Sequence, residues 1–560
     1  MPFLYQVGEH FLKNILNKAL YGFLRFFAFI EMPFFRTKNK VYKNEASSKK
    51  HLAFTAFLCG IVTIIPTLFV FLACCTRWIY SSFGKVGISA ILFTLKYANS
   101  GITAKDMLLF SLNCLIVPIL FYILFFKFIF KRSTLKSYSK KLIFKKSGKL
   151  SQIDFECEKA YKLKTSLFTL VCAATALVYT NYSLSVIQYI KNQFSETTIY
   201  EDYYIKPTDE VITFPEQKRN LIYIYLESME NTYVSYGEGG GFDENYMSGL
   251  TELAKNNTSF SNTDKLGGAN YFSEGMSYTM GGFVSQTAGI PLYSPILKRN
   301  KLDKFSDFLP GVRTLEDILH EQGYNQLMLQ GSPASFAGCN NFYGKYDNSR
   351  IIDYDYAKEN GLIPEDYFVF WGYEDKRLIE FAKDEITKMS SQSEPFAVTM
   401  FTIDTHRPNG YKCELCEDNF DSDYANAIDC SSRQIVALVD WLKQQDFYDN
   451  TTIIITGDHL SMNDPFFKHL DDDYVRTTYN VIINAPVSTD NVKNRTFMSI
   501  DMFPTTLACL GAEIKGDRLG LGTNLFSSTP TLAEQMGGEK LVTELNSHSA
   551  YYEKEFWFMD

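Results

Sequence analysis

Residues 220–233 read NLIYIYLESMENTY, and this stretch indicates the fold class of the second half of the chain. Asn220–Leu226 is an unbroken, β-rich apolar run, which is typical of a strand buried on both faces of a parallel sheet. Glu227 follows the predicted strand directly. Because open α/β sheets bind ligands at the carboxyl ends of their strands, Glu227 is well placed to bind a cation. A helix cap or a solvated turn is the alternative role for this carboxylate.

Two more predicted strands end in polar side chains. Thr451–Thr456 (TTIIIT) leads through a glycine to Asp458 and His459, and Phe396–Ile403 (FAVTMFTI) leads to His406. An Asp–His pair offers one hard and one borderline ligand, which suits Zn²⁺ or Mn²⁺. His406, at another strand end, suits proton transfer to or from a hydroxyl, with a structural histidine as the alternative.

Thr279 lies between the first and third of these strands in the sequence. Residues 279–289 read TMGGFVSQTAG and resemble the start of a helix. Helix N-termini favour anions because their first N–H groups are unpaired. A hydroxyl at this position, coordinated to a divalent metal, would be an activated nucleophile facing a bound phosphate, although a helix cap is the commoner role of threonine. We therefore expect four segments to converge on Thr279.

The first half of the chain contains three long apolar runs without charge, at Phe54–Thr76, Met107–Phe126 and Ser166–Ile190. Each is long enough to cross a bilayer. Strongly basic segments precede the first run and follow the second, which predicts that both segments are cytoplasmic. The residues after Ile190 are then expected on the outer side. Buried core helices are the alternative.

Shorter segments complete the predicted organisation. Residues 1–35 are predicted to form an amphipathic helix on the inner surface, or else a tilted extra span. Val86–Tyr97 is predicted as a short helix at the outer interface. The predicted domains are an N-terminal cytoplasmic-side region (1–50), a transmembrane unit (51–190), a polar linker (191–219) and an extracytoplasmic catalytic domain (220–560).

Composition narrows the functional classes. The 560 residues are too many for one ordinary core, and the net charge of −8 does not favour nucleic-acid binding. Cys413, Cys416 and Cys430 lie close together in the sequence. They give a weak zinc signal, and for an extracytoplasmic domain a disulfide from Cys430 to Cys413 or Cys416 is the favoured alternative, which leaves one thiol.

Several motifs together are similar to a known family. They occur in the expected order over roughly 220–526 and read NLIYIYLESMENTY, YTMGGFVSQTAGIPL, LQGSPASFAGCNNFYG, FWGYEDKRL, TIDTHRPNGY, GDHLSMND and LGLGTNLFS. The chain resembles the membrane-anchored phosphoglycerol transferases of bacterial envelopes, in the alkaline phosphatase and sulfatase superfamily. Among these, the resemblance is greatest to the transferases that modify periplasmic glucans, and lipoteichoic acid synthases are more distant.

The resemblance implies a fold and a reaction. The fold is an N-terminal α-helical transmembrane unit plus an α/β domain with a mixed central sheet flanked by helices. A divalent metal, Mn²⁺ or Mg²⁺ with Zn²⁺ as the alternative, would be held by Glu227, Thr279, Asp458 and His459. Thr279 would attack phosphatidylglycerol, release diacylglycerol and form a glycerophospho-threonine, which then passes to a hydroxyl of an envelope glycan. The implied location is the bacterial cytoplasmic membrane, with the catalytic domain in the periplasm.

The resemblance also implies substrate contacts. His406 matches a substrate-contacting histidine, followed by Arg407, and Trp371 and Gly372 match a segment that lines the cleft. The chain departs from the family at Cys339, where relatives usually carry Arg or Lys. It also lacks the His-Gly that relatives tend to have shortly downstream, and there Lys345 is the candidate replacement for a lost positive charge. These departures concern the acceptor site or the head-group specificity.

Two other functions remain open from the sequence. One is transfer of phosphoethanolamine to lipid A or a glycan, and the other is a non-catalytic envelope scaffold of the same fold. Sulfatase activity is disfavoured because the Cys/Ser-x-Pro-x-Arg segment is missing around Thr279. The chain ends at Asp560, soon after the fold is expected to close, so we expect no further C-terminal domain. The sequence does not indicate the acceptor glycan or the oligomeric state.

Overall fold

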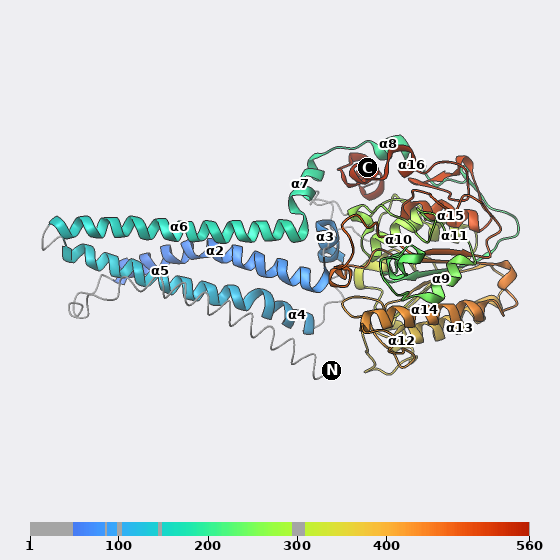
Figure 1. Cartoon of the computed structure of the whole chain (residues 1–560), viewed down its shortest axis with the longest axis horizontal. Coiled ribbons are helices and arrows are strands. Elements are labelled where there is room, and N and C mark those ends of the chain that lie inside the picture. The colour runs from blue at the N-terminus through green and yellow to red at the C-terminus, as the bar shows by residue number, and fades with distance from the viewer. Residues whose placement is uncertain (1–48, 85–86, 98–103, 144–147, 294–307, 559–560) are drawn as a thin grey trace. The chain divides into compact units, whose positions relative to one another are not determined.

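The structure, a computed structural model, describes residues 49–84, 87–97, 104–143, 148–293 and 308–558 (Figure 1). The amphipathic helix predicted within residues 1–35 lies outside these residues. The chain divides into two compact units, residues 1–65 with 122–163, and residues 66–121 with 164–560. The division runs through the apolar helices, and the predicted domain boundaries stay a prediction.

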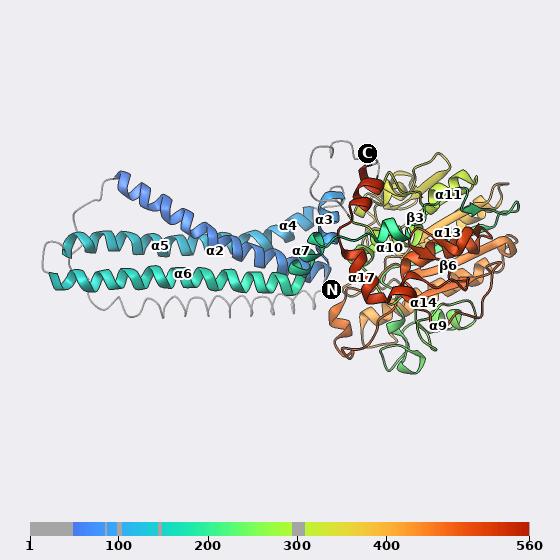
Figure 2. The same cartoon turned by 90° about the horizontal axis from the view of Figure 1, so that it is seen from above.

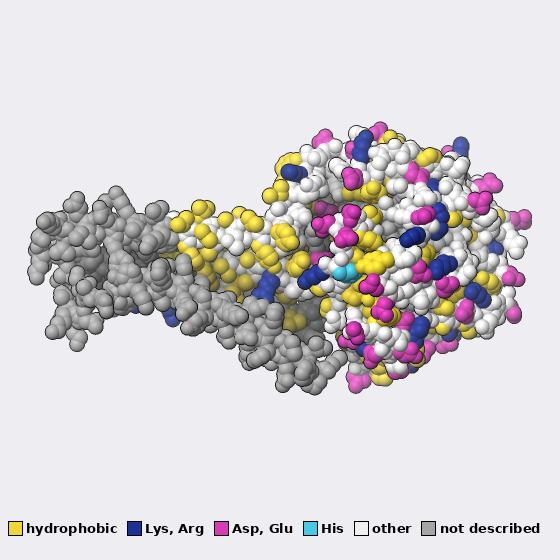
Figure 3. Space-filling model, viewed as in Figure 1, with side chains coloured by type: hydrophobic (Ala, Val, Ile, Leu, Met, Phe, Trp, Pro, Cys, Tyr) yellow, Lys and Arg dark blue, Asp and Glu magenta, His cyan; other side chains and the backbone are white. Residues whose placement is uncertain are grey.

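Three of the described helices contain stretches long and apolar enough to cross a membrane, at Ala56–Ser82, Met107–Lys131 and Thr165–Leu184. Figure 3 shows hydrophobic side chains along the described part of these helices, and many are exposed. The third stretch ends at Leu184 instead of the predicted Ile190, because Ser185 has a left-handed backbone (φ 51°) where the next helix begins. The helices of this region are α2 (Lys49–Phe83), α4 (Ala104–Phe110), the π-helix η1 (Ser111–Leu115), α5 (Ile116–Ile143), α6 (Gly148–Leu184) and α7 (Val186–Phe194).

Each unit contains contacts between these helices. In the first unit, a Cβ on Gly60 would lie 3.3 Å from the hydroxyl of Tyr122, so α2 and α5 approach closely there. In the second unit, the hydroxyls of Thr76 and Thr180 lie 2.9 Å apart and join α2 to α6. Close approach at small residues and interhelical hydrogen bonds are what hold apolar helices together in lipid.

The central sheet consists of six strands among the described residues, and Figure 2 shows two of them, β3 and β6, within it. Five neighbouring strands are parallel and the edge strand β7 is antiparallel to β6, which confirms the predicted mixed sheet. In spatial order the strands are β4 (Ser349–Ile352), β3 (Asn325–Gln330), β5 (Phe396–Phe401), β2 (Asn220–Leu226), β6 (Thr451–Gly457) and β7 (Asn480–Ile483). The predicted strands at 220, 396 and 451 are thus neighbours, although the second ends two residues early.

Alternate side chains of β2 divide the core into two layers, because successive residues of a strand point to opposite faces. Tyr223 and Tyr225 pack with α10, α11 and α15, while Ile222 and Ile224 pack with α9, α13 and α14. Figure 1 shows these two groups of helices on opposite sides of the sheet. Their bounds are α9 (Ser248–Lys255), α10 (Thr279–Ala288), α11 (Leu315–Glu321), α13 (Asp375–Ser390), α14 (Asp423–Leu442) and α15 (Met502–Cys509).

The segment 191–219, predicted as a linker, is folded onto this unit over part of its length. Ile199 and Tyr200 are buried, and β1 (Ile212–Thr213) pairs with β8 (Glu513–Ile514). The short helix predicted at 86–97 is present from Ile88 to Tyr97. The remaining elements are α3 (Ile88–Tyr97), α8 (Ile199–Tyr203), α12 (Tyr354–Glu359), α16 (Leu532–Met536), α17 (Gly538–Asn546), β9 (Arg518–Leu519) and β10 (Gly522–Thr523).

Candidate metal centre and nucleophile

The register of β2 and β6 brings the predicted ligands together. Leu226 pairs with Gly457, so Glu227 and Asp458 are the next residues on adjacent parallel strands. One ligand atom from each of Glu227, Asp458 and His459 lies within 4.8 Å of the other two. The three residues are 2%, 1% and 3% exposed. Three potential ligands therefore share one buried corner at the carboxyl edge of the sheet.

The donor set of this corner fits a divalent cation. Glu227 Oε2 and Asp458 Oδ2 are buried and have no hydrogen-bond partner among the described residues. His459 Nδ1 lies 2.8 Å from the carbonyl oxygen of Leu460, which only accepts, so Nδ1 carries a proton and Nε2 faces the carboxylates. Two carboxylate oxygens and an imidazole nitrogen fixed in this way are a donor set that fits a divalent cation.

The charges of these buried side chains also favour a bound cation. Burial and the nearby Glu227 carboxylate raise the pKa of Asp458 to about 7. Burial lowers the pKa of His459, but the Asp458 and Glu227 carboxylates raise it by more, so the pKa of His459 is raised overall. Two carboxylates in one buried site hold protons tightly because like charges repel in a low dielectric. A divalent cation would relieve this repulsion.

Thr279 lies beside this cluster. It is the first residue of α10, as predicted, and its hydroxyl oxygen is 3.4 Å from Nε2 of His459. The start of α10 is packed closely on the end of β6, because a Cβ on Gly282 would lie 2.3 Å from the carbonyl oxygen of Asp458. The structure thus gathers Thr279, Glu227, Asp458 and His459 in one place, with the positive end of a helix dipole at the hydroxyl.

Hydrogen bonds from neighbouring residues orient the ligands. Ser228 donates its hydroxyl to Glu227 Oε1 (2.6 Å) and its backbone N–H to Asp458 Oδ1 (2.8 Å). Thr402 accepts the N–H of Glu227 (3.1 Å), and Thr405 donates to its carbonyl (2.5 Å). The sequence alone did not identify these residues as part of the site. The only indication was their position next to the ends of predicted strands. Ser228 holds a left-handed backbone (φ 53°), an uncommon conformation for this residue type.

A second buried group supports the loop after His459. Glu230 is fully buried and forms an ion pair with Arg476, and it also accepts the N–H of Ser461 (3.0 Å). Arg476 donates to the carbonyl of Ser461 (2.7 Å). Nothing in the local sequence indicated this pair, since the partners are 246 residues apart.

His406 and Trp371 lie side by side, with ring centroids 4.8 Å apart. His406 Nδ1 donates to the carbonyl of Arg407 (2.9 Å), which leaves Nε2 without a proton in the neutral ring. Burial lowers the pKa of His406 to about 4, and the neighbouring His459 adds to this effect. At neutral pH the imidazole is therefore a proton acceptor.

The other predicted substrate contacts also touch neighbouring parts of the protein. Arg407 donates to the carbonyl of Ser81 (3.2 Å), and Lys345 pairs with Asp317 (3.6 Å). Cys339 is 4% exposed and its sulfur lies 3.3 Å from that of Met280, so it packs behind Thr279 instead of lining an open surface. Gly372 allows a close approach of two backbone segments, since a Cβ there would lie 1.9 Å from the carbonyl oxygen of Gly331.

The cysteine cluster contains a disulfide. Cys416 and Cys430 are bonded, which resolves the two pairings that the sequence left open. Cys430 belongs to α14, whereas Cys413 and Cys416 precede that helix. Cys413 is a free, buried thiol.

Comparisons with known proteins agree with this geometry. Residues 219–512 match the Sulfatase family. Phosphoglycerol transferase I of Xanthomonas axonopodis pv. citri (strain 306) is 30% identical over 342 residues, which covers 58% of this chain and 46% of that protein. Phosphoglycerol transferase I of Escherichia coli (strain 55989 / EAEC) is 29% identical over 337 residues, which covers 58% and 41%.

The matches thus span less than half the length of these curated relatives. Among solved structures, the lipoteichoic acid synthase LtaP from Listeria monocytogenes is similar with a TM-score of 0.42 and 18% identity. That match covers 59% of this chain and 81% of the other.

Proposed function

We propose that this chain, which belongs to the sulfatase family, transfers phosphoglycerol from phosphatidylglycerol to a hydroxyl of an envelope glycan. The observation that carries the proposal is the Thr279 hydroxyl, 3.4 Å from Nε2 of His459 in a buried Glu–Asp–His cluster. The matched curated relatives are named phosphoglycerol transferase I, which supports this transfer over sulfate chemistry. The residues around Thr279 also lack the Cys/Ser-x-Pro-x-Arg segment of sulfatases.

Glu227, Asp458, His459 and Thr279 are the residues that would hold a divalent metal, Mn²⁺ or Mg²⁺ with Zn²⁺ as the alternative. Such an ion lowers the pKa of a coordinated hydroxyl and offsets negative charge on a phosphate. Ser228 keeps Glu227 and Asp458 in place through its two hydrogen bonds. The carboxylates and the imidazole are thus oriented before any substrate arrives, which is what electrostatic stabilisation requires.

In the first half-reaction, the Thr279 oxygen attacks the phosphorus of phosphatidylglycerol. The bond from Thr279 oxygen to phosphorus forms, and the bond from phosphorus to the diacylglycerol oxygen breaks. Diacylglycerol leaves with a proton, and Thr279 carries a glycerophospho group. The N-terminus of α10 favours the phosphate because its first N–H groups point toward that end of the helix.

In the second half-reaction, His406 accepts the proton of a glycan hydroxyl, whose oxygen then attacks the phosphorus. The bond to Thr279 breaks and the threonine recovers its proton. His406 suits this role because its imidazole is neutral at physiological pH and its ring is fixed by the Arg407 carbonyl. We place the acceptor sugar against Trp371, whose ring centroid lies 4.8 Å from that of His406, with Gly372 in the same segment. We keep Arg407, Lys345 and Cys339 as candidate substrate contacts, and Nε and Nη1 of Arg407 are buried without a hydrogen-bond partner among the described residues.

The apolar helices explain how the donor reaches the site. Three described stretches are long and apolar enough to cross a membrane. We propose that all three span the bacterial cytoplasmic membrane, with the basic segments inside and the catalytic residues in the periplasm. The donor lipid then lies in the leaflet next to the catalytic domain, and only its head group needs to enter the site.

Release of diacylglycerol tests the proposal. The full chain in detergent, with Mn²⁺, is given vesicles of phosphatidylglycerol or of phosphatidylethanolamine. We expect diacylglycerol from phosphatidylglycerol only, and we expect Thr279→Ala to abolish it while the metal content of the variant stays measurable. Release by Thr279→Ala at the wild-type rate contradicts the nucleophile. Release from phosphatidylethanolamine instead supports a phosphoethanolamine transferase, and a chain that binds no divalent metal supports a scaffold.

A further inference from the structure

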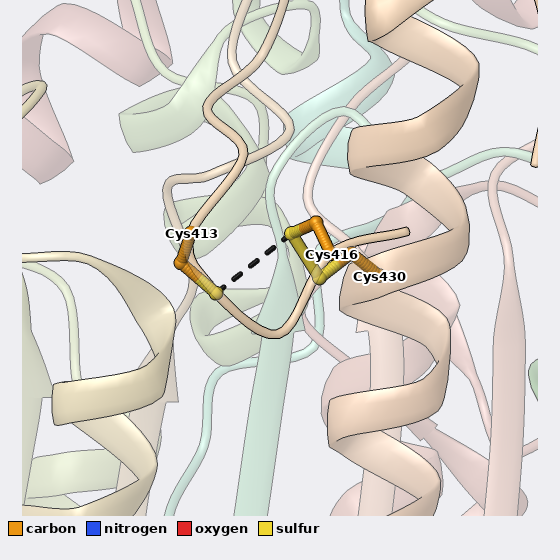
Figure 4. A group of neighbouring side chains, drawn as sticks. All are labelled: Cys413, Cys416 and Cys430. Carbon is orange, nitrogen blue, oxygen red and sulfur yellow. Dashed lines mark hydrogen bonds between the residues drawn. A yellow bond between two sulfur atoms is a disulfide. The ribbon is translucent and has the colours of Figure 1, made fainter. Parts of the chain in front are cut away.

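Three sulfur atoms lie close together where the loop after β5 meets α14 (Figure 4). Cys416 is in the middle, bonded to Cys430 on one side and 3.7 Å from the sulfur of Cys413 on the other. Cys413 and Cys416 belong to one tight turn, closed by a hydrogen bond from the Cys416 N–H to the Cys413 carbonyl (3.1 Å). A free thiol is thus held in contact with a disulfide, and such access is the first requirement of thiol–disulfide exchange.

From this geometry we infer that Cys413, Cys416 and Cys430 form an intramolecular thiol–disulfide exchange site. The thiolate of Cys413 attacks the sulfur of Cys416. A bond between Cys413 and Cys416 forms, the bond between Cys416 and Cys430 breaks, and the electron pair leaves on Cys430. Cys430 then takes up the proton that Cys413 lost. The step is balanced without an external oxidant or reductant.

The surroundings of Cys430 favour its departure. The side-chain amide of Gln434 donates to the Cys430 sulfur at 3.5 Å, one helical turn further along α14. A hydrogen bond of this kind stabilises a leaving thiolate, and a better leaving thiol speeds exchange.

The attacking sulfur is protected from solvent. Cys413 is 7% exposed, so its thiol has little contact with solvent. Burial raises the pKa of the Cys413 thiol, and the nearby Asp404 and Glu414 carboxylates raise it further. Exchange is therefore slow at neutral pH and accelerates as the pH rises, because only the thiolate attacks.

The exchange removes the covalent link between α14 and the loop that follows β5. In the observed state the disulfide joins residues 404–416 to α14. The same loop packs on α14 at Gly410, where a Cβ would lie 2.6 Å from Cβ of Ala427, and it donates from the N–H of Gly410 to the carbonyl of His406 (3.1 Å). A Cys413–Cys416 disulfide removes the covalent link to α14. Any effect of this change on turnover, through His406, rests on the proposed function, but the exchange itself does not.

Disulfide mapping tests the inference on the full chain in detergent. Samples kept at about pH 7, 8 and 9 are quenched in acid, unfolded, alkylated and digested for mass spectrometry. We expect a Cys413–Cys416 population beside Cys416–Cys430, appearing about tenfold faster per pH unit because the thiolate fraction rises tenfold per unit below the thiol pKa. Gln434→Ala should slow its appearance about fivefold, the factor of one ordinary hydrogen bond.

Two variants each allow only one of the two disulfides. Cys413→Ser should contain only Cys416–Cys430, and Cys430→Ser, treated with oxidised glutathione as the oxidant, should form Cys413–Cys416 completely. Cys509→Ser, which removes a buried free thiol elsewhere, should behave as the wild type. The inference is overturned if wild type shows only Cys416–Cys430 at every pH, or if a folded Cys430→Ser chain keeps Cys413 and Cys416 as thiols in the presence of oxidised glutathione. A second population whose rate of appearance does not depend on pH would also overturn it.

Discussion

A Cβ atom on Gly282 would lie 2.3 Å from the carbonyl oxygen of Asp458. Gly282 is three residues after Thr279 in α10, and Asp458 is the first residue after β6. This contact therefore sets the separation between the helix that carries the hydroxyl and the strand end that carries two of the metal-binding side chains. Only glycine allows the two backbones to approach so closely.

We expect Gly282→Ala to lower the rate of diacylglycerol release about a hundredfold, because the added methyl group forces the start of α10 away from Asp458 and misplaces the Thr279 oxygen. A helix-interior Gly→Ala change alone would stabilise the fold by about 0.5–1 kcal/mol. Gly237→Ala is the matched control, since the nearest atom to its Cβ is 3.9 Å away, at Ser235 Oγ. Equal activity of the two variants would show that the contact does not position Thr279.

Ser228→Ala should weaken metal binding by about tenfold to a hundredfold, the usual effect of removing a partner that orients a ligand. The hydroxyl of Ser228 holds Glu227 Oε1 at 2.6 Å, and no replacement donor is provided by alanine. Titration of the metal-free full chain with Mn²⁺ measures the change. Ser431→Ala is the control, because Ser431 is also a buried serine, and its hydroxyl has no hydrogen-bond partner within the described chain. Wild-type affinity in Ser228→Ala would argue against a metal on Glu227.

The main parts of the fold were predictable because strand ends carry a strong local signal. Asn220–Leu226 is buried at every position, so its apolar run showed both the strand and the first polar residue after it. The order of the strands was not predictable, since parallel strands buried on both faces have interchangeable side chains. The end of the third apolar helix was missed because one left-handed residue, Ser185, interrupts an otherwise continuous apolar run.

The supporting residues of the site were harder to predict for a different reason. Glu230 and Arg476 meet only through the fold, and neither belongs to a motif with a fixed spacing. The disulfide partner of Cys430 depended on which face of the turn points toward α14, and Cys413 and Cys416 were equivalent in sequence. At position 339 the fold buries the side chain against Met280, a contact that no sequence pattern indicated.

Breaking the buried ion pair should destabilise the chain more than replacing both partners. Arg476→Met leaves the carboxylate of Glu230, which is fully buried, without its cation, and we expect a loss of about 3–5 kcal/mol in the free energy of unfolding. Glu230→Gln with Arg476→Met should recover part of this loss. Urea unfolding followed by fluorescence measures both. Lys443→Met is the control, because its pair with Asp440 is exposed on both sides and contributes less than about 1 kcal/mol. A double variant less stable than Arg476→Met would contradict the explanation.

His406 should act as a base down to unusually low pH. Its pKa is lowered from 6.5 to about 4, mainly by burial, so the neutral form needed to accept a proton persists through the range in which an ordinary histidine becomes charged. We therefore expect transfer to the acceptor to show no loss from His406 between about pH 5 and 8, and a loss as the pH falls through about 4.

His406→Gln should slow the second half-reaction by about a hundredfold to ten-thousandfold, the usual contribution of a positioned base. Because Thr279 does not require His406 for the first half-reaction, this variant should accumulate the glycerophospho-threonine, detected by mass spectrometry of the intact chain. His320→Gln is the control, since His320 is a histidine that contacts Asn348 and Tyr346 and is not part of the candidate site. An acid limb near pH 6.5 that disappears in His406→Gln would show that this histidine titrates normally, and an absence of the covalent species would show that it acts before the threonine is modified.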